Sequence, residues 1–111
     1  MADRSEQSPE NVLSQMVGGY RISQAIFVAA ELGIADLLKD ESRSSDELAA
    51  AAGVNPQALH RVLVVLASVG VLREVGPTRF ALTPMGALLQ EGKALRHSAI
   101  MGAELFYRAY G

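Results

Sequence analysis

The sequence contains no cysteine and no tryptophan, and aromatic residues make up only 5% of it. Without cysteine the chain can form neither disulfides nor thiolate metal sites, which fits a protein of the reducing cytoplasm. Apolar residues still make up 50% of the sequence, so most of them are alanine, valine, leucine and isoleucine. Such a composition is typical of packed helices. It is rich for a chain of 111 residues, and we expect part of the apolar surface to meet another chain.

The chain also lacks a basic excess and a long apolar run. Lysine and arginine number 10 against 12 acidic residues, for a formal net charge of −2. An autonomous DNA-binding domain usually carries a clear positive excess, because phosphate contacts supply much of its affinity. No apolar run approaches the ~20 residues of a membrane span, and the polar start (residues 1–10) is no secretory signal. We therefore expect neither nucleic acid nor a membrane as a partner.

The first third of the chain predicts two helices after a disordered tail (residues 1–8). The first begins near Pro9 with Ser8 as its N-cap, and Gly18-Gly19 should weaken or end it. The second spans about residues 21–32 and is apolar nearly all round between Ala25 and Ala30, so it needs cover on most sides. In so small a domain a second subunit is the natural cover. The predicted dimer interface consists of Val12, Leu13, Met16, Val17, Ile22, Ile26, Phe27 and Ala30.

The rest of the chain predicts a winged-helix pattern. A capping box (Ser44 and Glu47) opens a helix over 46–52, and Pro56 opens a longer one over about 57–69. A hairpin wing follows, with strands at 71–75 and 80–83, then a short helix to about residue 90. A last helix runs from about Leu95 or Ser98 to Tyr110. The predicted fold class is mainly α, a winged-helix-like domain with one small β-hairpin, intertwined as a helical dimer.

A winged helix raises the alternative of a DNA-binding transcriptional regulator. In such proteins the second helix of the pair presents polar side chains to the major groove. Here that helix is apolar over most of its circumference, and Arg61 is its only cation. The hairpin wing contributes the cations Arg73 and Arg79, and Glu74 offsets part of their positive charge. Burial against protein explains this helix better than base reading does, but the regulator remains the rival interpretation.

Several blocks of sequence resemble one enzyme family when they are taken in order. Residues 29–38 (AAELGIADLL) match the pattern A-x-x-L-G-I-x-D-x-L, and similar blocks follow at 45–49 (SDELA), 59–63 (LHRVL), 66–72 (LASVGVL) and 80–84 (FALTP). Residues 97–111 are similar to a helix that leads into a catalytic domain. Over about three-quarters of its length, the chain thus resembles the N-terminal dimerisation domain of bacterial and plant-type small-molecule O-methyltransferases.

The resemblance implies a homodimer that is non-catalytic by itself, with residues 9–111 as the dimerisation domain. The parent enzyme would transfer a methyl group from S-adenosylmethionine to a hydroxyl of an aromatic or polyketide-like secondary metabolite. Some members of the family do other reactions on the same scaffold. The catalytic Rossmann-like domain, whose glycine-rich turn holds the cofactor, is absent from this sequence. A standalone module that caps a separate catalytic protein is a third interpretation.

No residue of this sequence is predicted to be catalytic, to bind a cofactor or to bind a metal. The only histidines, His60 and His97, adjoin helices and are expected to make ordinary hydrogen bonds. The family resemblance places the first and last helices near an acceptor pocket that only the missing catalytic domain would complete. Residues that could line the wall of that pocket are Met16, Tyr20, Met101, Phe106, Tyr107 and Tyr110.

Overall fold

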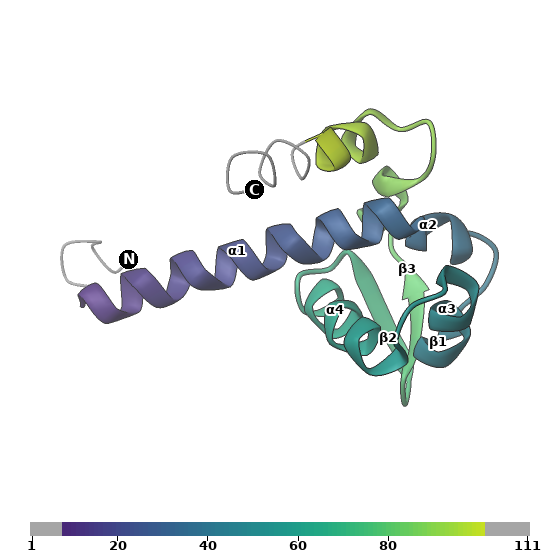
Figure 1. Cartoon of the computed structure of the whole chain (residues 1–111), viewed down its shortest axis with the longest axis horizontal. Helices are drawn as coiled ribbons and strands as arrows, with labels where there is room; N and C mark the ends of the chain where they lie inside the picture. Colours follow the sequence, from purple (N-terminus) through teal and green to yellow (C-terminus); the bar gives the residue numbers. More distant parts are fainter. Residues whose placement is uncertain (1–7, 102–111) are drawn as a thin grey trace.

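The computed structural model describes residues 8–101, and one long helix dominates it (Figure 1). This helix, α1, runs without a break from Pro9 to Leu32. Ser8 caps its start by accepting a hydrogen bond from the amide of Asn11 (3.1 Å), and Gly33 ends it in the left-handed conformation at φ 69°. The Ser8 cap was predicted from the sequence. A short helix, α2 (Ile34–Leu37), follows at once.

The predicted break at Gly18-Gly19 is wrong. Glycine costs a helix interior about 1 kcal/mol relative to alanine, which weakens the helix but does not forbid it. Neither glycine has a positive φ, and both continue the helical hydrogen-bonding pattern of α1. The two helices expected from the sequence are therefore one rod of 24 residues.

The middle of the chain forms a helix–turn–helix followed by a small sheet. Helix α3 (Ser45–Ala52) begins with the predicted capping box, and α4 (Pro56–Ser68) is capped by Asn55. Strands β2 (Leu72–Gly76) and β3 (Arg79–Leu82) form the expected hairpin. The sequence did not predict β1 (Arg43–Ser44), which pairs with β3 and makes a three-stranded antiparallel sheet of order β1-β3-β2.

The segment after the sheet returns to α1. The helix predicted to follow Thr83-Pro84 is a 3₁₀ helix, η2 (Gly86–Leu89). Residues 94–101 are helical and lie along α1 on the side away from α4 (Figure 1). Two hydrogen bonds fasten this part: Arg96 Nε donates to the carbonyl of Ala30 (3.1 Å), and the amide of Glu91 donates to the carboxylate of Asp36 (3.2 Å).

The core lies between α4, the sheet, α2 and α3, and α1 reaches it only with its last turns. Its largest fully buried side chains are Phe80, Ile34, Leu48, Leu63 and Leu66. From α1, the buried residues are the three small ones Ala25, Ala29 and Ala30. The structure therefore leaves the first half of α1 outside the core. Within residues 8–101, no helix combines the length and the hydropathy needed to cross a membrane.

Gly86 lies so close to the backbone of Val71 that a side chain at position 86 should destabilise the fold. A Cβ there would overlap the carbonyl oxygen of Val71 and lie 2.9 Å from Leu82 Cδ1. Gly86→Ala should lower the free energy of unfolding by about 2 kcal/mol or more, as overpacked buried sites do. Chemical denaturation measures this effect. Gly76→Ala is the matched control, because the nearest atom to its Cβ lies at 3.9 Å; equal stability of the two variants would contradict the packing described here.

Candidate functional site

The free half of α1 exposes a set of large apolar side chains. No residue from 8 to 21 is buried, although this segment is helical from Pro9 onward. Met16 and Leu13 are 67% and 62% exposed, and Val12, Val17 and Tyr20 are exposed as well. No charged residue lies between Glu10 and Arg21. A helical segment of this length with two glycines is marginal in water by itself, so it needs cover that residues 8–101 do not supply.

The structure divides the predicted interface residues into two groups. Four of them are exposed on the free half, namely Val12, Leu13, Met16 and Val17, and Ile22 at its end is half-buried. Ile26 packs against the chain's own core, and Phe27 is half-buried. Ala30 is fully buried within its own chain, where Arg96 bonds its carbonyl, and it has no surface left to offer a partner.

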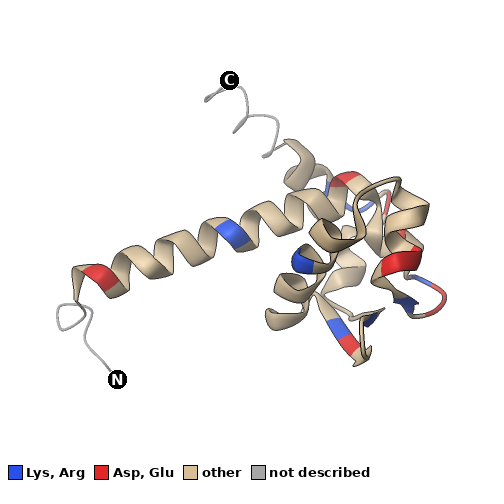
Figure 2. Cartoon of the chain, turned by 60° about the horizontal axis from the view of Figure 1, so that its bottom comes forward, with Lys and Arg blue, Asp and Glu red and all other residues tan. Residues whose placement is uncertain are grey.

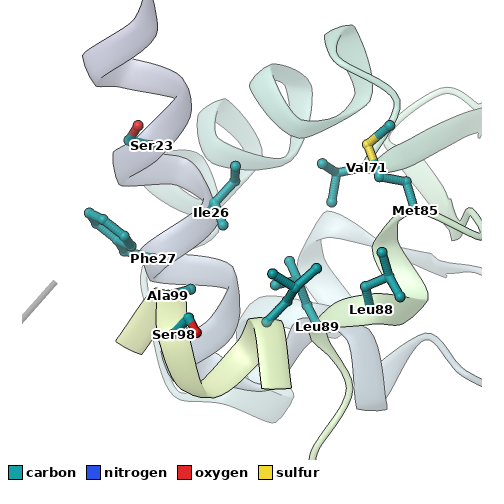
Figure 3. Close-up of a pocket in the computed structure, with 10 residues that line it drawn as sticks. Ser23, Ile26, Phe27, Val71, Met85, Leu88, Leu89, Ser98 and Ala99 are labelled. Atoms are coloured by element: carbon teal, nitrogen blue, oxygen red, sulfur yellow. The ribbon is translucent and has the colours of Figure 1, made fainter. Parts of the chain in front are cut away.

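An apolar groove continues the exposed surface of α1 toward the C-terminal part of the chain (Figure 3). It has a volume of about 410 Å³, and no charged side chain lines it. One wall is α1 and another is helix 94–101; Val71, which precedes β2, and the segment from Met85 to Leu89 lie between them. The lining residues are Ser23, Ile26, Phe27, Val71, Met85, Leu88, Leu89, Leu95, Ser98 and Ala99.

Sequence reasoning missed most of this groove. It placed Ile26 and Phe27 in an interface but gave no role to Met85, Leu88 or Leu95. The local signal was the run of apolar residues after Pro84, which is too long to be buried by a single 3₁₀ turn. The contact that positions the opposite wall, Arg96 on Ala30, joins residues 66 apart and has no local signature.

The residues predicted to wall an acceptor pocket do not meet in the described chain. Met16 and Tyr20 lie on the free half of α1, and Met101 is exposed on helix 94–101. None of the three is among the residues that line the groove. Phe106, Tyr107 and Tyr110 lie outside the described residues. The pocket-wall assignment therefore stays a prediction.

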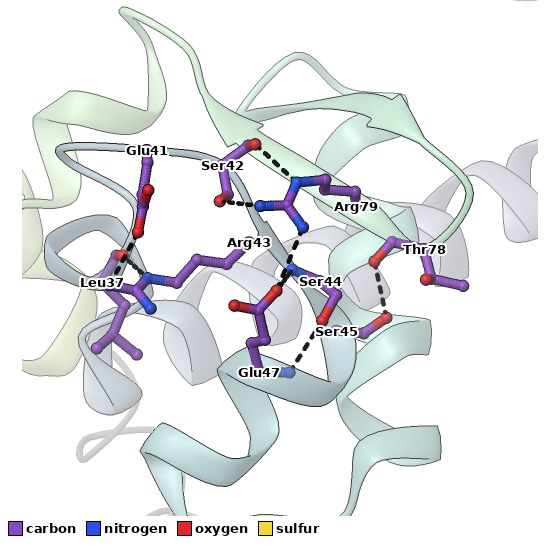
Figure 4. Close-up of polar contacts among 9 residues, drawn as sticks. All are labelled: Leu37, Glu41, Ser42, Arg43, Ser44, Ser45, Glu47, Thr78 and Arg79. Atoms are coloured by element: carbon purple, nitrogen blue, oxygen red, sulfur yellow. Dashed lines mark hydrogen bonds and ion pairs between the residues drawn. The ribbon is translucent and has the colours of Figure 1, made fainter.

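Two arginines near the helix–turn–helix bind groups of their own chain and are not presented to a nucleic acid (Figure 4). Arg79 donates to Glu47 Oε1 (3.2 Å) and to the hydroxyl and carbonyl oxygens of Ser42 (both 2.9 Å). Arg43 donates to the carbonyl of Leu37 (2.7 Å) and lies 3.9 Å from the carboxylate of Glu41. Figure 2 shows basic and acidic residues interspersed along the ribbon of the described chain. This arrangement does not suit phosphate binding.

The one serine–histidine pair near the helix–turn–helix is structural. Ser45 is buried, and its Oγ lies 3.0 Å from His60 Nδ1 and 3.2 Å from the carbonyl oxygen of Thr78, to which it donates. When the single proton of the Ser45 hydroxyl goes to Thr78, the other bond requires a proton on His60 Nδ1. The pair ties the hairpin turn to α3 and α4. Within the described residues, no three histidine or carboxylate side chains gather as a metal site would require.

Comparison with known proteins identifies the family. The model of the O-methyltransferase dimerisation domain matches residues 14–92. The chain belongs to this family. The match includes part of the free half of α1, the helix–turn–helix and the sheet, and it favours none of the regulator families that the rival interpretation would require.

The dimerisation domain is similar to part of several longer methyltransferases. Phenazine O-methyltransferase of Lysobacter antibioticus is 45% identical over 102 residues, which cover 90% of this chain and 30% of that protein. The crystal structure of LaPhzM superposes with a TM-score of 0.83 at 43% identity, covering 94% of this chain and 32% of that one. The SAH-bound structure of CalO1, a methyltransferase in calicheamicin biosynthesis, gives a TM-score of 0.74 at 39% identity, covering 91% and 30%. The chain thus spans about a third of the length of these relatives.

The polar cluster of the dimerisation domain predicts a pH dependence of its stability. Hydrogen bonds from the backbone and side chain of Ser44, with a smaller contribution from Arg79, lower the pKa of Glu47 below its ordinary value. A carboxyl whose pKa is depressed by folding stabilises the folded state above its unfolded pKa and loses that contribution as the pH falls through its folded pKa. Glu47→Gln retains a carbonyl oxygen for the Ser44 amide and removes only the charge.

We therefore expect Glu47→Gln to be less stable than the parent at neutral pH, with the difference vanishing under acid conditions. Urea denaturation of both proteins between neutral pH and pH values below the ordinary range of a glutamate measures this difference. Asp46→Asn, on the neighbouring exposed carboxylate, serves as the control. If the stability difference between the parent and Glu47→Gln grew as the pH fell, the lowered pKa of Glu47 would be contradicted.

Proposed function

We propose that this chain is the homodimerisation domain of a longer S-adenosylmethionine-dependent O-methyltransferase that acts on an aromatic or polyketide-like secondary metabolite. One observation carries the proposal: the first half of α1 exposes five large apolar side chains to water. It does so in a chain that matches a family of dimerisation domains. The domain acts by association and takes no chemical part in methyl transfer.

Association follows from the hydrophobic effect on α1. Each fully buried valine, leucine or methionine side chain contributes about 1.5–3 kcal/mol relative to its exposed state. In a twofold dimer every such residue is buried twice, once on each copy. The stripe that includes Leu13, Met16 and Val17 can therefore supply the core of an obligate interface, which typically resembles a domain core divided in two.

The acceptor and the cofactor are inferred from the relatives. One relative is named as a phenazine O-methyltransferase, and another solved relative contains SAH. SAH, S-adenosylhomocysteine, is what S-adenosylmethionine becomes when it has given up its methyl group. In the longer protein, S-adenosylmethionine supplies the methyl group and a ring hydroxyl receives it.

The described residues of this chain do not fit that cofactor. A Rossmann-like cofactor site needs parallel strands joined by a helix, with a glycine-rich turn at the helix start. The three strands described here are antiparallel, and β2 and β3 are joined by a tight turn. Binding and catalysis thus belong to the rest of the longer protein. The absence of cysteine from this chain fits a cytoplasmic location, which we include in the proposal.

Substitution on the free half of α1 tests the proposal. Met16→Asp should leave the fold intact, because the side chain is 67% exposed, and should weaken dimerisation at least about tenfold by burying an unpaired charge. Sedimentation velocity over a concentration series measures the effect. Ser14→Asp is the control, since Ser14 lies on the opposite face of the same exposed helical segment.

A monomeric parent chain at micromolar concentration would overturn the proposed homodimer, as would equal dimerisation of the Met16 and Ser14 variants. Ile26→Asp is a poorer probe, because Ile26 packs against the chain's own core and its replacement would also test folding.

A further inference from the structure

Helix 94–101 lies against the apolar groove without belonging to the core of the domain. No described residue after Leu89 is buried, and none belongs to the buried hydrophobic cluster. Yet the helix contributes Leu95, Ser98 and Ala99 to the lining of the groove. Its apolar contacts are therefore limited, and its polar contacts decide where it lies.

We propose that helix 94–101 is a strap that closes one side of the groove, with Gly92 as its hinge. The bond from Arg96 to Ala30 is the latch that holds the strap shut. The proposal concerns a single copy of the chain, so it stands or falls independently of the proposed homodimer.

The chain is anchored to the domain immediately before the hinge. Leu89 is buried in the core. The amide of Glu91 then donates to both carboxylate oxygens of Asp36 in α2, at 3.2 Å each. The backbone is thus fixed up to Glu91, and a movement of the helix has to begin after this residue.

Gly92 provides the point at which the chain can turn. Its φ is 86°, in the left-handed region that side chains disfavour, and a Cβ there would meet nothing within 4 Å. Glu91, Lys93 and Ala94 beside it are exposed. A hinge needs a few positions whose φ and ψ can change without a steric clash, and this short stretch supplies them.

Arg96 fastens the strap on the far side of the hinge. Its Nε donates to the carbonyl of Ala30 (3.1 Å), which also accepts from the amide of Gly33 (3.3 Å). A carbonyl oxygen has two lone pairs, so the Gly33 bond persists whether the latch is open or closed. The last turn of α1 carries partial negative charge and has no basic residue of its own, which favours the Arg96 cation there.

Release of the latch would reshape the groove. If the strap turns about Gly92, the side chains of Leu95, Ser98 and Ala99 leave the wall, whereas Phe27 stays on α1. Figure 3 shows Ser98 and Ala99 beside Phe27 in the closed arrangement. Such a local opening exposes little surface, so its free energy is lower than that of global unfolding. Any molecule that binds the open groove better than the closed one will favour the released latch.

Hydrogen exchange distinguishes an opened strap from an unfolded domain. Arg96→Met removes the charge and the donors of the latch but keeps an apolar stem. The amides of helix 94–101 should then exchange about tenfold faster or more, because one charged hydrogen bond typically corresponds to at least that factor. The amides of α4 should exchange at the rate of the parent. Lys93→Met, which removes an exposed cation from the same segment, is the matched control.

Arg96→Lys should restore most of the protection, because its ammonium group can approach the same carbonyl. Equal exchange of helix 94–101 in Arg96→Met and the parent would overturn the latch, and so would an equal loss of protection in Arg96→Lys and Arg96→Met. Faster exchange in α4 as well would show that Arg96 stabilises the whole fold, which contradicts a local strap. A parent chain with unprotected amides in helix 94–101 would contradict the closed state.

A distance within one copy provides a second measurement. The sequence contains no cysteine, so spin labels can be attached at Ala50→Cys in α3 and at His97→Cys on the strap, both exposed positions. Dilution of the labelled chain into excess unlabelled chain of the same background confines the measurement to one copy.

The label-to-label distance should be narrowly distributed when the latch is intact and should gain a second, broader population in Arg96→Met. Gly92→Ala should also broaden the distribution, because alanine disfavours the left-handed conformation of the closed hinge. Lys93→Met should keep the narrow distribution. An unchanged distribution in either Arg96→Met or Gly92→Ala would refute the hinged strap.

Discussion

The way α1 joins the core sets the character of the whole molecule. Ala25 and Ala29 belong to the same buried cluster as Leu63 and Leu66 of α4, so the two helices meet through small side chains on one partner and large ones on the other. Alanine has only one methyl group to bury, worth less than about 1 kcal/mol in transfer free energy. The helix is held firmly over its last turns, and nothing in the described part of the chain buries the turns before them. A long exposed apolar segment is the direct consequence.

The rest of the domain serves to hold that segment at a fixed angle. The sheet is tied to α3 through Ser45, whose amide and hydroxyl both donate to the carbonyl of Thr78, at 2.8 and 3.2 Å. Arg79 and Glu47 join β3 to the first turn of the same helix. These contacts engage Arg79 and Glu47 within the chain. The same helix–turn–helix thus becomes a rigid base for association between proteins.

Helix 94–101 forms one wall of the apolar groove beside α1. Arg96 supplies a cation to the C-terminal end of α1, where that helix has no basic residue of its own in its last turn. A cation is favoured there, because the carbonyl groups at a helix end carry partial negative charge. The contact therefore stabilises the end of α1 and positions the groove wall at once. In this domain, the end of α1 and the shape of the groove depend on the same bond.

The local elements could be read from the sequence, because their signals are local. The Ser44–Glu47 capping box, the Ser8 cap and the β2–β3 hairpin each depend on residues within a few positions of one another. The family could also be recognised, because its blocks keep their order along the chain. The exposed apolar residues at 12, 13, 16 and 17 were predicted as interface residues for the same reason: a helical stripe has a fixed period.

What the sequence could not determine is decided by contacts between distant residues. Strand β1 forms only because β3 lies beside it, and α1 stays whole through Gly18-Gly19 although local propensity favours an end there. In a helical pattern Ala30 and Ile26 look like interface residues. In the structure Ala30 is fully buried and its carbonyl is bonded by Arg96, and Ile26 is partly buried against the chain's own core. The groove exists only where α1, η2 and helix 94–101 converge. Periodicity shows which face of a helix is apolar, but only the packed chain decides how much of that face is left for a partner.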